Sequence, residues 1–200
     1  MEKRNELRTL VECAVFIALG VVLSLIKIFK MPLGGSVTLA SMLPVCVISV
    51  RHGLKYGMIS SFVYSLFQLV FGITLDGLLG WGLTPVMLVG CIMFDYIVAF
   101  SVLGCAGMFR KLGEGGVYLG ISAVFTARFL SHFLSGYVIF KNLEQWELFG
   151  SVFESRPALY SVCYNALYML PELVITLVIV VILMRIPYFR KEVLRVEGGA

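Results

Sequence analysis

Residues 85–109 read PVMLVGCIMFDYIVAFSVLGCAGMF, an apolar stretch with a single charged residue, Asp95, near its middle. A helix that crosses the hydrocarbon core of a bilayer needs about 20 apolar residues, so this stretch is long enough. A charged side chain at membrane depth is costly, and it is retained where it faces other protein or a water-lined cavity. The stretch therefore predicts a transmembrane helix that carries a functional carboxylate.

The composition of the whole chain is that of an integral membrane protein. Of its 200 residues, 60% are hydrophobic and 14% are charged, whereas soluble domains are about 45–50% apolar and about 25% charged. We expect one membrane domain over residues 1–200. The five cysteines follow no metal-ligand spacing and are odd in number, so we predict neither a metal centre nor a disulfide framework. The basic residues form no stripe with interleaved aromatics, which argues against nucleic-acid binding.

Six apolar segments predict an all-α bundle of about six transmembrane helices. They cover residues 9–29, 39–50, 54–73, 85–109, 116–140 and 158–186. The second segment is short and contains Pro44, so we expect it to be tilted, kinked or partly re-entrant where protein buries it. The first run is too long for a signal-peptide core and is interrupted by Glu12, which favours a retained helix.

The basic residues between these segments predict the orientation of the bundle. Eleven of them fall on one side: Lys3, Arg4, Arg8, Arg51, Lys55, Arg110, Lys111, Arg185, Arg190, Lys191 and Arg195. Four fall on the other: Lys27, Lys30, Lys141 and Arg156. By the positive-inside rule both termini are cytoplasmic. The connections 30–38, 74–84 and 141–157 then lie outside, and their length suits a cavity that opens outward.

Polar side chains on the last two segments are spaced to share helix faces. Arg128 and His132 are four residues apart, and Tyr160, Tyr164 and Tyr168 follow one another at the same interval. Asn165, Tyr168 and Glu172 run along an overlapping face of the same segment. With Asp95, this set provides charge, amide hydrogen bonding and aromatic walls, which suits a small, flat, polar ligand with a cationic part.

Each of these residues also has a plainer interpretation. Asp95 and Arg128 would form a structural ion pair between helices, His132 would be a core histidine, and the tyrosines would pack or form an interfacial belt. For Glu12 and Glu172 we expect structural or partner-binding roles. The small residues Ala14 and Ala18 allow close approach of a helix, either inside the bundle or from a partner.

Five blocks of sequence, in order, resemble the substrate-binding (S) components of energy-coupling factor (ECF) vitamin transporters, specifically the thiamine-specific branch. These blocks are GGSVTLASMLPV (34–45), RHGLKYG (51–57), FDYIVAFSVLGCAGMFR (94–110), RFLSHFLSGYVIF (128–140) and LYSVCYNALYMLPE (159–172). The resemblance implies a six-helix bacterial plasma-membrane protein with no catalytic activity and no cofactor. It would bind thiamine with high affinity from outside and associate with a transmembrane coupling protein and two cytoplasmic ATPase subunits.

The resemblance also implies the roles of individual residues. The ligand carboxylate of the family matches Asp95, and the other matching positions complete a predicted binding set: Gly35, Tyr96, Arg128, His132, Phe140, Tyr160, Tyr164 and Asn165. Gly35 and Phe140 stand where some members have tryptophan, and Asp95 stands where some have the longer Glu. Trp81 or Trp146 is a candidate for the missing ring. The pair that the family uses against the coupling protein matches Ala14 and Ala18.

The sequence leaves two alternatives to thiamine capture. An S-component for another small heterocyclic vitamin or a thiamine precursor would use the same fold. An intramembrane enzyme built on Asp95 and His132 is disfavoured, because the sequence has no H-E-x-x-H or G-x-S-x-G motif. A phosphate-binding G-x-x-x-x-G-K-[ST] loop is also lacking, so ATP hydrolysis would have to come from other subunits.

Overall fold

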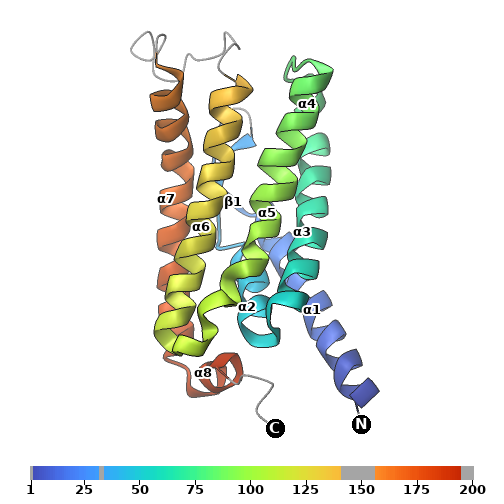
Figure 1. Ribbon diagram of the computed structural model, residues 1–200, viewed down its shortest axis with the longest axis vertical. Coiled ribbons are helices and arrows are strands. Elements are labelled where there is room, and N and C mark those ends of the chain that lie inside the picture. The colour runs from blue at the N-terminus through green and yellow to red at the C-terminus, as the bar shows by residue number, and fades with distance from the viewer. Residues whose placement is uncertain (1, 32–33, 141–155, 195–200) are drawn as a thin grey trace.

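The computed structural model describes residues 2–31, 34–140 and 156–194 as a bundle of helices standing side by side (Figure 1). Within these ranges five helical stretches are long and apolar enough to cross a membrane. They are α1 (Glu2–Leu25), α3 (Leu54–Thr74), the stretch from α4 to η4, α6 (Glu114–Val138) and α7 (Pro157–Met184). The predicted all-α membrane bundle is confirmed.

The second predicted segment forms α2 (Leu43–His52), which is too short to span a bilayer. We expected about six spans. The described ranges contain five helical stretches long enough to span a membrane, and α2 is a shorter apolar helix. Pro44 lies in its first turn, where a missing N–H costs nothing. Gly53, with φ of 88°, ends it. Residues Leu43–Val50 are all buried, so protein encloses α2 as the sequence predicted for a short segment.

The first helix ends earlier than the predicted residue 29, and the connection that follows it contains a β-hairpin. α1 ends at Leu25, and β1 (Lys27–Lys30) pairs antiparallel with β2 (Ser36–Thr38). This hairpin is the one sheet found in the described ranges. The apolar run continues to residue 29, which suggested a longer helix. Its last residues form a strand instead, in which Phe29 pairs with Val37.

The fourth span is continuous but irregular, and its irregularity falls on Asp95. It runs through α4 (Pro85–Cys91), the π-helical turn η3 (Ile92–Val98), α5 (Ala99–Ser101) and the 3₁₀ stretch η4 (Val102–Leu112). Short π-helical turns interrupt the regular backbone ladder and are common at functional sites. Here the carbonyl of Phe94 accepts a hydrogen bond from Ser131 Oγ on α6, at 2.6 Å. The widened turn is thus fastened to the neighbouring helix.

The start of α1 and the short helix α8 (Pro187–Leu194) lie at the same end of the bundle (Figure 1). Arg51 Nη2 joins them, with Glu12 Oε2 and Glu192 Oε2 both at 3.0 Å. The structural role expected for Glu12 is confirmed by these contacts. Both described ends of the chain thus lie on one side, in keeping with the predicted orientation.

Candidate ligand-binding site

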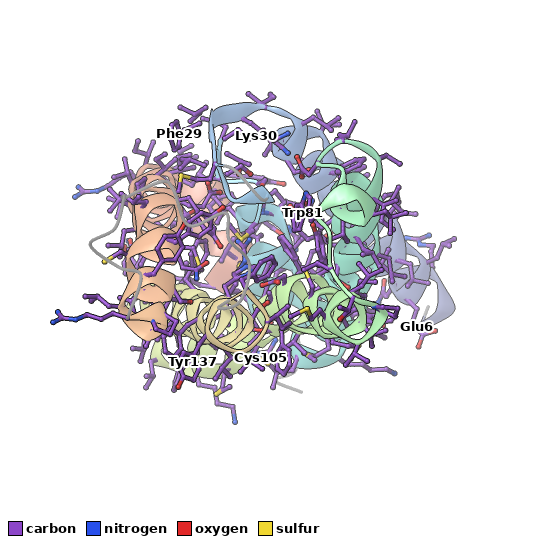
Figure 2. The ribbon with its side chains drawn as sticks, turned by 90° about the horizontal axis from the view of Figure 1, so that it is seen from above. Glu6, Phe29, Lys30, Trp81, Cys105 and Tyr137 are labelled. Carbon is purple, nitrogen blue, oxygen red and sulfur yellow. The ribbon has the colours of Figure 1, made fainter. Side chains whose placement is uncertain are left out.

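A cavity reaches the end of the bundle opposite α8, between the hairpin, η3, α6 and α7. All nine residues of the predicted binding set line it: Gly35, Asp95, Tyr96, Arg128, His132, Phe140, Tyr160, Tyr164 and Asn165. Seen from above, Trp81 lies within the ring of helices, whereas Glu6 and Tyr137 lie on its outside (Figure 2). The fold therefore brings together, from three spans and one loop, the side chains that helical spacing and the family resemblance predicted.

The carboxylate of Asp95 is held by donors from two helices. Oδ1 lies 2.8 Å from Nδ1 of His132, and Oδ2 accepts hydrogen bonds from the Ser135 hydroxyl and, at 3.2 Å, from the Cys91 thiol. The Asp95 side chain is 16% exposed, and that remaining surface faces the cavity. A charge fixed in this way is presented to a ligand without losing freedom when the ligand binds.

His132 lies between Asp95 and Arg128 and bonds both. Arg128 Nε donates to His132 Nε2 at 3.2 Å. Because a guanidinium has no acceptor, Nε2 must be the unprotonated nitrogen, and the ring proton sits on Nδ1 and points at Asp95. The direct Asp95–Arg128 ion pair considered from the sequence does not occur among the described contacts. His132 is thus more than a core histidine, because it orients the carboxylate.

Arg128 is buried at the foot of the cavity, with its guanidinium 4.3 Å from the centre of the Phe100 ring. Nη1 also contacts the sulfur of Met42, at the start of α2. A cation over an aromatic face is stabilised by the ring quadrupole, especially when it is desolvated. These contacts fix Arg128 and, through it, His132.

The tyrosines of α7 form an aromatic wall. Tyr160 and Tyr164 are stacked with ring centres 6.0 Å apart, and Tyr164 meets Tyr168 edge-on at 6.1 Å. Tyr168 donates to Asn165 Oδ1 at 2.7 Å, while Asn165 Nδ2 donates to the Ser161 carbonyl at 2.8 Å. The packing interpretation of the tyrosine stripe is therefore partly correct, but the same rings also face the cavity.

The loop side of the cavity is built by Gly35 and Trp81. A Cβ on Gly35 would lie 2.9 Å from the ring of Tyr168, so only glycine lets the hairpin turn approach α7 this closely. Trp81 lines the cavity with its ring centre 6.2 Å from that of Phe140. Its indole Nε1 donates to the Asp76 carbonyl at 3.0 Å. Of the two candidate tryptophans, Trp81 is therefore in place, and Trp146 lies outside the described residues.

Several lining residues were not predicted from the sequence. Asp76 lies at the mouth, paired with Lys27 Nζ at 2.8 Å and Lys30 Nζ at 2.9 Å. Ser135 does not line the cavity but bonds Asp95, and the sequence offered a signal for it, because it follows His132 by three residues and so shares its helix face. Asp76 was not, because nothing in the sequence shows that residues 27, 30 and 76 meet. No cluster of metal ligands occurs in the described ranges.

The predicted partner residues lie away from this site. Ala14 and Ala18 are exposed on α1, among apolar side chains that are also exposed. Packing inside this bundle, the plainer interpretation of the pair, is therefore wrong. The pair is available to a second protein or to lipid.

Comparisons with known proteins agree on one family. A model of the family described as thiamine transporter protein (Thia_YuaJ) matches residues 10–189. The chain is 31% identical to the thiamine transporter ThiT of Bacillus subtilis, over 92% of this chain and 93% of that protein. A solved structure of ThiT from Listeria monocytogenes has the same fold, with a TM-score of 0.68 at 22% identity over 93% of this chain and 98% of that one. The chain therefore belongs to the thiamine transporter protein family and is a multi-pass plasma-membrane protein.

Proposed function

We propose that this protein is the high-affinity thiamine-binding S-component of an ECF-type importer, and that thiamine binds in the cavity around Asp95. The observation that carries the proposal is the fixed carboxylate of Asp95, which faces a cavity walled by aromatic rings. Thiamine carries a permanent positive charge on its thiazolium ring and hydrogen-bonding groups on its aminopyrimidine ring. Family membership supplies the ligand class.

The lining residues divide into complementary roles. Asp95 balances the ligand cation, and in a cavity shielded from water the Coulomb attraction is stronger than in bulk solvent. Tyr96, Tyr160, Phe140 and Trp81 supply the aromatic walls, with Trp81 and Phe140 lying next to each other. A cavity lined by several aromatic rings suits a ligand made of two flat heterocycles.

Asn165 meets the ligand heteroatoms. The two ring nitrogens of His132 already bond Arg128 and Asp95, so His132 acts by orienting the carboxylate and Arg128 keeps it in place. Tyr164 and Gly35 complete the wall at the junction of α7 and the hairpin. Asn165 is already held by Ser161 and Tyr168, so it binds a ligand without reordering.

Transport driven by ATP would require partners, because the sequence has no G-x-x-x-x-G-K-[ST] loop of its own. The exposed pair Ala14 and Ala18 on α1 would contact the transmembrane coupling protein, which would link this chain to two cytoplasmic ATPases. Small residues let a partner helix approach closely in the bilayer. The function is then capture and delivery, without catalysis.

The proposal is tested with two measurements. Isothermal titration of the purified protein with thiamine should give tight binding, and a dissociation constant in the millimolar range would refute it. Mass spectrometry of ligand that co-purifies with the protein should find thiamine. A different heterocycle would instead identify an S-component for another vitamin or precursor. Turnover of a candidate substrate by the protein alone would favour the alternative of an intramembrane enzyme.

A further inference from the structure

Glu172 on α7 is among the most deeply buried side chains of the described structure, at 1% exposure, and the binding set does not include it. It does not line the cavity. Both of its oxygens bind a single residue of the hairpin: Oε2 accepts from the Thr38 backbone N–H at 2.5 Å and Oε1 from the Thr38 hydroxyl at 2.6 Å. A buried carboxylate whose two oxygens both accept hydrogen bonds from one residue holds that residue firmly in position.

The fastened residue begins a tight turn that continues the cavity wall. Thr38 Oγ1 lies 2.8 Å from Ser41 Oγ and accepts from the Ser41 backbone N–H at 3.3 Å. Between them, Ala40 has φ of 51°, which is costly for a residue with a Cβ and persists only where its surroundings impose it. Thr38, Ser41 and Met42 all line the cavity.

The same turn leads back to the ligand carboxylate. Met42 contacts the guanidinium of Arg128, which bonds His132, which bonds Asp95. A shift of the turn would therefore move both the loop wall and the chain of polar groups that orients Asp95.

We propose that Glu172 is a positioning residue for the ligand site, which fixes the 38–42 turn to α7 and so holds the cavity wall in its binding conformation. This inference rests on the proposed function only for the identity of the ligand. Its direct consequence is a local one: without the Glu172 carboxylate the hairpin opens more often, and a bound ligand leaves sooner.

Glu172→Met tests this, because methionine fills a similar volume but has no oxygen to accept the two Thr38 bonds. We expect thiamine to dissociate about 10- to 100-fold faster, since two hydrogen bonds to a charged group are lost. Glu172→Gln should stay within about threefold of wild type, because its amide retains one acceptor and its NH₂ can donate to a reoriented Thr38 hydroxyl. A Gln variant that behaves like the Met variant would refute positioning by hydrogen bonds.

A matched pair of isosteric variants tests the same inference in case Glu172→Met does not fold. Thr38→Val removes the hydroxyl bonds of the turn but keeps the backbone bond to Glu172. Thr176→Val makes the same change one turn along α7, at a buried hydroxyl without a hydrogen-bond partner in the described ranges. Thr38→Val should speed dissociation severalfold and Thr176→Val should not. Equal rates for the two would overturn the inference.

Hydrogen–deuterium exchange separates this inference from the proposed function, since it needs no ligand. Peptides covering residues 34–42 should exchange at least about tenfold faster in ligand-free Glu172→Met than in wild type, with α3 unchanged. Unchanged exchange in the hairpin would refute the positioning role even if thiamine binds. If the exchange effect is present but the wild-type protein does not bind thiamine, only the proposed identity of the ligand is refuted.

Discussion

Replacement of Asp95 by asparagine is the sharpest probe of the site, because it removes a charge and leaves the shape. The Asn oxygen can still accept from Nδ1 of His132, and its NH₂ can donate to the hydroxyl of Ser135, which is free to accept. Arg128 keeps its bond to the other ring nitrogen. The variant should therefore fold with the same cavity and differ in the loss of the negative charge that meets the ligand cation, besides the weak hydrogen bond from the Cys91 thiol.

The size of the effect follows from that single loss. A hydrogen bond or contact to a charged group contributes about 1.5–3 kcal/mol. Since 1.4 kcal/mol corresponds to a tenfold change in affinity, the dissociation constant for thiamine should rise by about 10- to 140-fold. A neutral aminopyrimidine without the thiazolium ring should lose less, because it has no fixed charge to balance.

Isothermal titration of the purified variants measures this directly. Glu114→Gln is the control, because it also neutralises a carboxylate but lies at the far end of α6, paired with Arg190 at 3.0 Å. That variant should bind thiamine as the wild type does. If Asp95→Asn bound thiamine within about twofold of wild type, the carboxylate would not be the ligand's counter-ion, and the proposed binding mode would be wrong.

Three further predictions address the walls and the partner surface. Trp81→Ala should weaken thiamine binding by about 1–2 kcal/mol through lost stacking, as titration would show, and unchanged affinity would exclude a ring contact. Gly35→Ala should weaken binding about tenfold or more, because the new Cβ meets the neighbouring α7 ring at 2.9 Å. Gly115→Ala, with nothing within 4 Å, should not. Ala14→Leu with Ala18→Leu should reduce ATP-driven thiamine uptake in cells yet leave thiamine binding intact, and normal uptake would contradict the partner role.

The bundle and the polar centre of the site could be predicted from the residues themselves because their signals are local, whereas Gly35 and Phe140 entered the predicted set only through the resemblance to the family. An apolar run of sufficient length must form a helix in lipid, since every backbone group has to be satisfied within the segment. Residue spacing determines which side chains share a helix face, so Arg128 and His132, four residues apart, had to point in the same direction. The charge of Asp95 then identified which faces converge, because it cannot be left in lipid.

The parts that were missed depend on contacts between segments distant in the sequence. The strand at Lys27–Lys30 exists because it pairs with Ser36–Thr38, and an apolar run that continues a helix gives no sign of that partner. Trp81 was one of two candidates for the missing ring, and the choice between them depends on where the loop of Trp81 folds, which residue spacing cannot decide. For the same reason Glu172 was assigned no place in the site.

The polar chain through the bundle is better explained by binding than by stability. Glu172, Arg128, His132 and Asp95 are all buried or nearly so, and each is satisfied by the turn or by its neighbour. Buried charges of this kind are often replaceable by apolar residues without loss of stability, so their presence needs another reason. The chain ends at Asp95, whose carboxylate faces the interior of the cavity, and every other member restricts its position. A bundle that only had to fold in lipid would gain nothing from this arrangement, whereas one that must hold a cation at a fixed point requires it.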